Sequence, residues 1–362
     1  MTPISPAHPP ITLKRVPCPL CDHTASTRLL VVPDWCLGVT GDAEFAIERC
    51  DQCGHAFMNP APTPESIPLC YPDGYPEHKA DQSGTEPLAP PSPASSAGTV
   101  DAPPTTAVSA PSSRTPWYLS PSVRRIPGLR GLYYWLTDPQ SQPVPPGAGR
   151  GQRALEIGCG SGRFLVALRE AGWEAQGLDL VPAAVEVSRE KGFAVHCGDL
   201  DTFSCPPESF DGIFAWQVLE HLPRPRETLQ LLRSLLKPNG CVGFGVPNYG
   251  GLECRLFGRY WSVHELPRHL QHFTPQVLQR LLTETGFTDI KIHYQPSLRN
   301  WLGSVGYWLR DRFPRSSWGP RLVDWYFLNP PLMVTLLMAP VARLLSFFRL
   351  TGRLTIIARR AD

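Results

Sequence analysis

Short apolar runs alternate with amphipathic ones through most of the chain after residue 150. The runs predicted to be strands are 153–158, 174–180, 193–199, 210–219, 241–248, 287–295 and 352–360. The segments with the apolar spacing of helices are 163–172, 181–192, 225–240 and 275–286. Strands that alternate with helices of this length indicate a mostly parallel sheet covered on both faces. The predicted fold class is therefore α/β, with a doubly wound, Rossmann-like sheet of seven strands.

The N-terminal part has a different pattern, in which four cysteines form two C-x2-C pairs. Cys18 and Cys21 are separated from Cys50 and Cys53 by 28 residues. Each pair places two thiolates on one tight turn, and two such turns supply the tetrahedral donor set of a structural zinc. We therefore expect these four cysteines to bind zinc in a small ribbon spanning residues 12–78. Because such a site has no open ligand position, the metal should stabilise the fold and carry no chemistry.

Residues 79–115 are rich in Pro, Ser and Ala and almost free of large apolar side chains. Such a segment cannot bury enough apolar surface to offset its ordering entropy, so it is predicted to be a disordered linker. Apolar residues then return, and LRGLYYWL at 129–136 is a predicted helix. The second domain is assigned to 116–362, with a Trp- and Arg-rich helical insertion at about 297–350.

A glycine-rich stretch, LEIGCGSGRF, joins the first predicted strand of this domain to the first helix. Gly158, Gly160 and Gly162 alternate along it, so the backbone can approach a ligand closely at the carboxyl edge of the sheet. The spacing is G-x-G-x-G, whereas the dinucleotide fingerprint is G-x-G-x-x-G and places a pyrophosphate on the helix N-terminus. The spacing argues against NAD and favours a cofactor without a pyrophosphate.

The ordered set LEIGCGSGRF, GLDL, CGDL, FDGIFAWQVLEHL and LLKPNGCVGFGVPN resembles the class I S-adenosylmethionine-dependent methyltransferases. The resemblance covers roughly residues 151–295 and the last strand. It implies that the glycine loop and Glu156 lie at the methionine end and ribose of the cofactor. It also implies that Asp179 accepts from both ribose hydroxyls, which suits a carboxylate. For Glu156, an alternative role is to orient the loop.

The same resemblance assigns four further residues to the cofactor site. Asp199 matches the acid that meets the adenine amino group, and the neighbouring Leu200 is expected to lie against the ring. Trp216 and Gln217 end the fourth strand, where the sulfonium and the acceptor should meet.

The zinc pattern, CGHAFMNPAPTPESIPLCYPDGY and PRHLQHFTPQVLQRLLTETGF are together similar to a bacterial group of methyltransferases associated with cell-surface polysaccharide, sugar or secondary-metabolite pathways. The long insert after the ribbon departs from the group's more compact pattern. The resemblance implies methyl transfer to a small-molecule or glycan acceptor, such as a nucleotide- or lipid-linked sugar.

Three histidines fall within nine residues in HELPRHLQHF, which follows the fifth strand. Pro267 disfavours a helix, so we expect an irregular loop beside the cofactor, up to the next helix. Removing a proton from a hydroxyl or an acidic carbon suits a histidine with its ordinary pKa of about 6.5. His269 is the first candidate for this general base, and His272 and His221 are further candidates. Structural packing is the alternative for each of them.

Two more roles were considered for this loop. Arg268 is a candidate anchor for a phosphate or carboxylate of the substrate. A second metal is disfavoured because Glu265 is the one carboxylate within the loop.

The basic charge is concentrated at the end of the chain. From residue 291 onward there are eleven Lys and Arg against three Asp, although the whole chain has a net charge of +2. The run 326–342 is free of charges but contains three prolines and is too short to span a bilayer. Helices that pack on the core or form a dimer interface are the favoured interpretation of 301–350. Peripheral contact with a membrane is the alternative. The sequence does not predict an oligomeric state.

No apolar export signal marks the N-terminus, so the pattern predicts a cytoplasmic protein, with membrane association as an option. An RNA-base methyltransferase is an alternative function, because some such enzymes have a similar zinc knuckle. However, residues 12–58 hold four Lys and Arg against six Asp and Glu, and a surface that meets phosphates should be basic. We therefore expect no nucleic-acid partner. A non-catalytic scaffold that binds cofactor and zinc is the third possibility.

Overall fold

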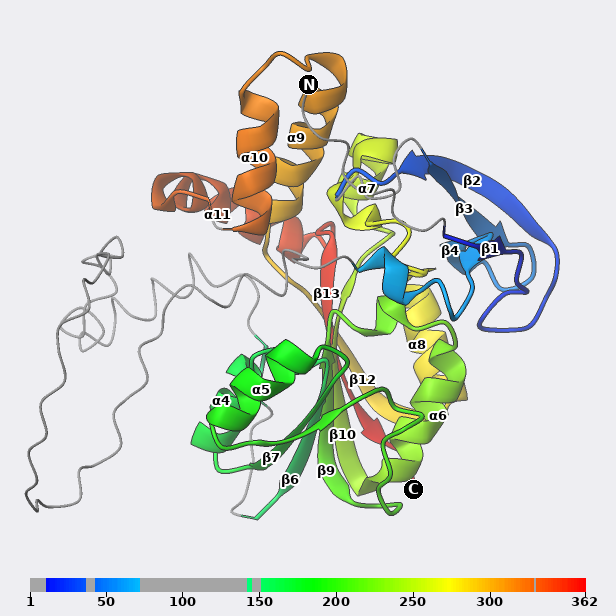
Figure 1. The fold of residues 1–362 in the computed structure, drawn as a ribbon, viewed down its shortest axis with the longest axis vertical. Coiled ribbons are helices and arrows are strands. Elements are labelled where there is room, and N and C mark those ends of the chain that lie inside the picture. Colours follow the sequence, from blue (N-terminus) through cyan, green and yellow to red (C-terminus); the bar gives the residue numbers. More distant parts are fainter. Residues whose placement is uncertain (1–10, 37–42, 72–141, 145–150, 329) are drawn as a thin grey trace, which may run out of the picture.

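The computed structural model describes residues 11–36, 43–71, 142–144, 151–328 and 330–362. A seven-stranded sheet forms the centre of the larger module, in the order β12-β13-β10-β9-β6-β7-β8 (Figure 1). Its strands are β6 (Arg153–Ile157), β7 (Glu174–Asp179), β8 (Ala194–Cys197), β9 (Phe210–Trp216), β10 (Leu236–Pro247), β12 (Phe287–Tyr294) and β13 (Arg353–Arg360). Strands β8, β7, β6, β9 and β10 are mutually parallel, and β13 lies antiparallel between β10 and β12. The predicted doubly wound α/β sheet is confirmed.

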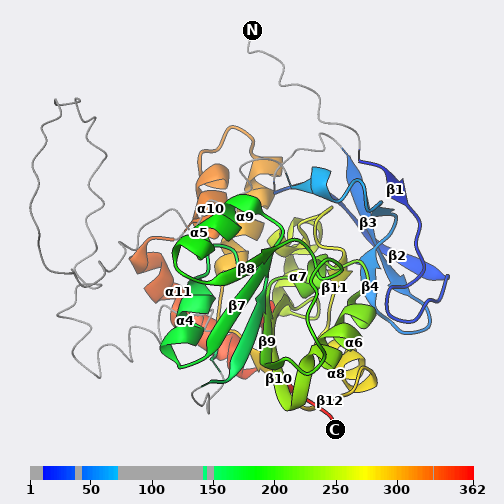
Figure 2. The same cartoon turned by 60° about the horizontal axis from the view of Figure 1, so that its bottom comes forward.

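Helices cover both faces of this sheet. Figure 2 shows α4 (Arg163–Glu170) and α5 (Pro182–Glu190) on one side and α6 (Pro225–Leu235) and α8 (Pro275–Glu284) on the other. Proline occupies the first turn of α5, α6 and α8, where its missing N–H costs nothing. The Thr274 side chain caps α8 by accepting from Val277 N. Each face therefore buries its own hydrophobic cluster.

One boundary differs from the prediction. The helix predicted over 225–240 ends at Leu235, and β10 begins at Leu236 rather than at 241. Leu236 pairs with Phe210 before a register shift to Cys241. Asn239 has a φ of +61°, and Pro238 has no N–H, so the segment cannot continue the helix. Its residues start the strand instead.

The N-terminal module is a second, four-stranded antiparallel sheet in the order β11-β4-β3-β2. Its strands are β2 (Ser26–Pro33), β3 (Glu44–Cys50), β4 (Ala56–Met58) and β11 (Gln271–His272), and β1 (Leu13–Lys14) pairs separately with β5 (Ala61–Pro62). Strand β11 belongs to the histidine-rich segment, where an irregular loop was expected. Its Gln271 pairs with Phe57, and Met58 N donates to Leu270 O at 2.9 Å. The larger module therefore supplies one strand of the ribbon's sheet.

Three helices follow β12: α9 (Arg299–Arg312), α10 (Trp318–Phe327) and α11 (Leu332–Phe347). Helices α9 and α10 lie side by side, and a Cβ on Gly306 would be 2.8 Å from Val323 Cγ2. Among the described helices, none combines the length and apolarity that crossing a bilayer requires. The predicted linker, 79–115, and the predicted helix at 129–136 lie outside the described residues.

Candidate functional site

The glycine loop joins β6 to α4 at the carboxyl edge of the sheet. Gly158, Gly160 and Gly162 have φ angles of 68°, 52° and 79°. A Cβ on Gly158 would lie 2.6 Å from Val218 Cγ2, and one on Gly162 would lie 2.8 Å from Ser188 Oγ. These two positions require glycine because of both the left-handed backbone and the adjacent chain.

Neighbouring elements hold this loop in place. Gly158 N and Cys159 N donate to Leu178 O at 2.8 and 3.2 Å. Ser188 Oγ, from α5, donates to Gly160 O at 2.8 Å. The loop is therefore fixed by hydrogen bonds to β7 and from α5.

Two carboxyl groups adjoin the loop. Asp179, at the end of β7, accepts from Gly160 N at 2.8 Å and from Val181 N at 2.9 Å. Because a carboxylate has about four acceptor positions, it can also accept from two hydroxyls of a ribose. Glu156 is buried, and its Oε2 has no hydrogen-bond partner among the described residues. Burial, reinforced by the charge of Asp179, raises the pKa of Glu156 well above its ordinary value, so this carboxyl can donate a hydrogen bond.

The next strands bring the other predicted cofactor residues to the same edge. Asp199 is exposed after β8, and its Oδ1 accepts from both Thr202 N and Thr202 Oγ1 at 2.9 Å. These bonds lower the pKa of Asp199 and keep it ionised. Leu200 is half-buried against the hydrophobic cluster beside it. An acceptor and an apolar surface are therefore adjacent, as an adenine ring requires.

Strand β9 ends at the predicted meeting point of cofactor and acceptor. The Trp216 ring is buried against Phe164 and Phe214, with ring centroids 5.2 and 6.2 Å away. The Trp216 side chain is therefore packed in the core. Gln217 has a φ of +56°, its N donates to Gly245 O at 2.8 Å, and its Oε1 accepts from Arg353 at 3.3 Å. Gln217 thereby turns the chain out of β9 into the next segment.

Three polar side chains converge directly after this turn. Glu220 and His221 belong to the short helix η3 (Leu219–His221), and the segment after β10 brings His269 against them. The rings of His221 and His269 are 4.6 Å apart and nearly perpendicular, at 76°. One donor atom from each of Glu220, His221 and His269 lies within 4.8 Å of the others. Two of the three predicted base candidates are therefore brought together.

The hydrogen bonds of the two rings assign their protons. His269 Nδ1 lies 2.9 Å from Val263 O, and His221 Nδ1 lies 3.2 Å from Arg268 O. Because a carbonyl can only accept, each Nδ1 must carry a proton, which leaves each Nε2 with its lone pair. Burial lowers the pKa of both rings to about 3. Desolvation therefore keeps both histidines neutral and makes each a weaker base than the predicted histidine with a pKa near 6.5.

His272 lies apart from this group. Its ring, in β11, is 5.2 Å from Tyr249 and 5.8 Å from His264. His264 in turn has its Nε2 2.9 Å from Gly258 O. Both rings are buried, and burial lowers the pKa of both.

The predicted role of Arg268 as a substrate anchor is corrected by the structure. Its side chain and that of Asp34 are both fully buried, with Nη2 2.7 Å from Oδ1. Arg268 Nη1 also donates to Cys70 O at 3.4 Å. The guanidinium therefore binds the ribbon rather than a substrate.

The four ribbon cysteines form a compact donor set. Cys18 Sγ lies 3.5 Å from Cys53 Sγ, and Cys21 Sγ lies 3.6 Å from Cys50 Sγ. A disulfide would need about 2.05 Å, whereas four thiolates at about 2.3 Å from one zinc are roughly 3.8 Å apart. All four sulfurs lie within 4.8 Å of one another. The donor set fits the predicted structural zinc.

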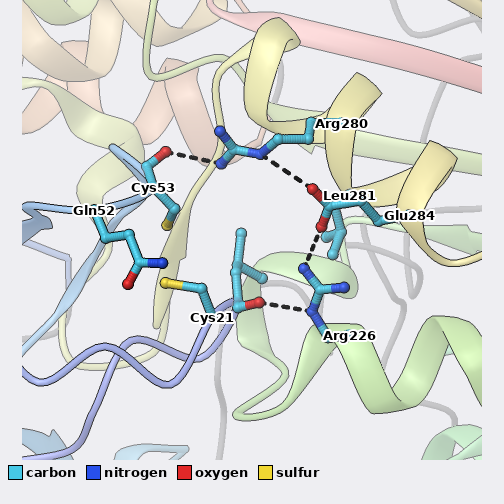
Figure 3. Close-up of a pocket in the computed structure, with 8 residues that line it drawn as sticks. Cys21, Gln52, Cys53, Arg226, Arg280, Leu281 and Glu284 are labelled. Carbon is cyan, nitrogen blue, oxygen red and sulfur yellow. Dashed lines mark hydrogen bonds and ion pairs between the residues drawn. The ribbon is translucent and has the colours of Figure 1, made fainter.

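Figure 3 shows a pocket where the zinc knuckles meet α6 and α8. Arg226 donates to Leu20 O at 2.6 Å and pairs with Glu284, and Arg280 donates to Cys53 O at 2.8 Å. These bonds attach both knuckles to the larger module. The pocket is lined by ribbon and helix residues and contains none of the glycine-loop residues.

Three residues of this region are not among those predicted from the sequence. Glu220 directly precedes His221 and could have been proposed from the motif LEHL. From the ribbon, Tyr71 contacts His221 and Asp34 contacts Arg268, and their spacing in the sequence gives no signal of these contacts.

A family model described as a methyltransferase domain matches residues 137–292. The chain is 33% identical over 167 residues to the ubiquinone biosynthesis O-methyltransferase of Paraburkholderia phymatum, covering 41% of this chain and 72% of that protein. It is 28% identical over 157 residues to the enzyme of the same name from Idiomarina loihiensis, covering 40% of this chain and 64% of that protein. A solved S-adenosylmethionine-dependent methyltransferase from Archaeoglobus fulgidus is 22% identical, with a TM-score of 0.39, and the match covers 65% of this chain and 92% of that one.

The chain belongs to the S-adenosylmethionine-dependent methyltransferases. The described sheet and glycine loop agree with that family, and S-adenosylmethionine is the cofactor that fits the loop. The resemblance drawn from the sequence is confirmed at this level.

Proposed function

We propose that this protein transfers a methyl group from S-adenosylmethionine to a hydroxyl of a small-molecule or glycan acceptor. The observation that supports this most strongly is the position of the neutral His221–His269 pair. It follows β9 at the same sheet edge as the glycine loop and Asp179. A cofactor held by that loop and an acceptor beside the two rings would be neighbours.

Different residues of the chain are proposed to bind different parts of the cofactor. When bound, S-adenosylmethionine supplies an electrophilic methyl group on a sulfonium. The main chain of the glycine loop, Glu156 and Asp179 bind its methionine end and ribose, and Asp199 and Leu200 bind its adenine. This assignment follows the donors, acceptors and apolar surface described above.

His269 is the proposed general base. Its Nε2 carries the lone pair and lies 3.7 Å from Glu265 Oε2. Glu265 is itself held by Tyr326, whose Oη donates to Oε1 at 2.8 Å. A nearby carboxylate favours the imidazolium that forms when His269 takes the acceptor's proton. His221 and Glu220 lie beside His269 and add further polar groups to the site.

The acceptor is proposed from the chemistry of the site and from the relatives. Both named relatives are O-methyltransferases of ubiquinone biosynthesis, which supports oxygen as the accepting atom. A hydroxyl acceptor must lose a proton, and His269 Nε2, beside Glu265, is the group proposed to take it. A nucleotide- or lipid-linked sugar remains the proposed acceptor class.

The helices α9 to α11 favour a lipid-linked acceptor within that class. Helix α11 exposes Met333, Leu337, Val341, Leu344 and Phe347, which recur every three or four residues on one side. Helix α9, helix α10 and the turn between them add the exposed rings of Trp308, Trp318 and Phe313, with the Arg321 guanidinium 5.6 Å from the Trp318 ring centre. Exposed apolar and aromatic side chains with an arginine among them suit an anionic membrane surface. We propose peripheral contact there.

A screen of methyl acceptors with mass detection tests the proposed function. It should include nucleotide sugars, lipid-linked sugars and short RNA, each with wild-type protein and His269→Ala. We expect one added methyl group on a sugar-containing acceptor and turnover lowered about 10²- to 10⁴-fold in His269→Ala. Methylation of RNA alone would favour the RNA-base alternative, and no transfer to any acceptor despite cofactor binding would favour the scaffold.

A further inference from the structure

The ribbon reaches the proposed catalytic pair through one side chain. Tyr71 follows the short helix η1 (Pro68–Cys70) at the end of the described ribbon. Its Oη lies 2.9 Å from His221 Nδ1, and the two ring centres are 6.1 Å apart. The preceding residue contributes as well, because Cys70 O accepts from Arg268, which neighbours His269 in the sequence. The ribbon thus contacts both segments that carry the pair.

The chemistry of this contact follows from the second bond at the same nitrogen. Arg268 O lies 3.2 Å from His221 Nδ1 and can only accept, so Nδ1 carries the proton. The Tyr71 oxygen at 2.9 Å is then the nearer of two acceptors for one N–H. If His221 turned its protonated nitrogen the other way, a lone pair would face the Arg268 carbonyl. The Arg268 carbonyl, which can only accept, therefore sets the tautomer, and the Tyr71 hydroxyl, accepting from the same N–H, holds the ring in one orientation.

We propose that Tyr71 is a positioning residue of the methyl-transfer site, which holds the His221 ring, with its proton on Nδ1, beside Glu220 and His269. The inference rests on the proposed function, in which this pair faces the acceptor. It gives the N-terminal module a role beyond folding. A ribbon that is fixed by β11 and by the Arg268–Asp34 pair places the Tyr71 hydroxyl at the site.

Tyr71→Phe tests the inference, because it removes the hydroxyl oxygen and keeps the ring. Tyr260→Phe is the matched control, since Tyr260 Oη donates to Asp311, which is not part of the proposed catalytic group. For both variants, zinc content and affinity for S-adenosylmethionine are measured first. Turnover, KM for the acceptor and the imidazole nitrogen resonances of His221, assigned with His221→Gln, are then compared with wild type.

We expect Tyr71→Phe to keep its zinc and its cofactor affinity and to lower kcat about tenfold, the effect of losing one hydrogen bond of roughly 1.4 kcal/mol. The share of the Nε2–H tautomer of His221 should rise in this variant and stay at the wild-type level in Tyr260→Phe. Unchanged kcat with an unchanged tautomer would overturn the inference. Reduced kcat with an unchanged tautomer would also overturn it, because Tyr71 would then act on the substrate directly. The His221 resonances are measured without turnover. If the wild-type protein transfers no methyl group, the proposed function is contradicted, and the resonances still test the role of Tyr71.

Discussion

The buried pair of Arg268 and Asp34 offers a sharp test of how the ribbon is joined to the site. Both side chains have no exposed surface, and Nη2 lies 2.7 Å from Oδ1. Asp34→Ala leaves the guanidinium buried without this carboxylate. Breaking a buried pair from one side costs about 3–5 kcal/mol. Since a domain's stability is about 5–15 kcal/mol, this one change should remove a large fraction of it.

The assay is equilibrium unfolding in urea with zinc present, followed by tryptophan fluorescence. Glu44→Ala is the control. Arg259 and Glu44 form an ion pair with an N–O distance of 3.1 Å, but their side chains are half exposed, and such pairs contribute about 0–1 kcal/mol to stability. The double variant Asp34→Leu with Arg268→Met removes both charges and should recover most of the lost stability. An Asp34→Ala cost below about 1 kcal/mol would refute the reasoning, since breaking a buried pair should cost several times more.

Three further predictions concern the zinc, the histidines and the proposed base. Purified protein should contain one equivalent of zinc, and its removal by a chelator should unfold the ribbon; metal-free protein with an intact ribbon would exclude the site. Burial lowers the pKa of His55 and His264 to about 4 from about 6.5, so the unfolded chain binds more protons between these values. Stability, measured by urea unfolding, should therefore be full above pH 6.5 and fall by about 1 kcal/mol per buried histidine by pH 5.5; a flat profile would contradict the burial. His269→Ala should keep cofactor affinity while losing turnover, and His264→Ala should lose much less turnover. If kinetic assays showed equal losses of turnover in the two variants, His269 would not be the general base.

The sequence predicted the sheet well because its signal is local. Apolar runs of strand length alternate with helices, and the seven strands lie where those runs are. The start of β10 was missed because Leu236 and Lys237 continue the helical spacing, and Pro238 ends the helix without showing where the strand begins. Strand β11 was missed because two residues leave no periodic pattern, and its partner β4 lies more than 200 residues away.

The candidate site was predictable to the extent that its parts are contiguous. Three glycines and Asp179 adjoin predicted strand ends, so their meeting at one sheet edge follows from the fold class. His221 and His269 are 48 positions apart in the sequence, and this spacing does not reveal that folding brings their rings together. The burial of Arg268 depends on Asp34, 234 residues earlier, and an isolated arginine in a loop gives no sign of it.

Cofactor binding tests the central claim most directly, because it needs no knowledge of the acceptor. Calorimetry should compare the S-adenosylmethionine affinity of wild type, Asp179→Ala and Asp201→Ala. Asp201→Ala is the control, because the Asp201 side chain lies near the same sheet edge but is 80% exposed. Each hydrogen bond to a charged group contributes roughly 1.5–3 kcal/mol, so Asp179→Ala should weaken S-adenosylmethionine binding at least tenfold. Asp201→Ala should bind like wild type. If Asp179→Ala bound the cofactor as tightly as wild type, the cofactor would lie elsewhere and the assigned site would be wrong.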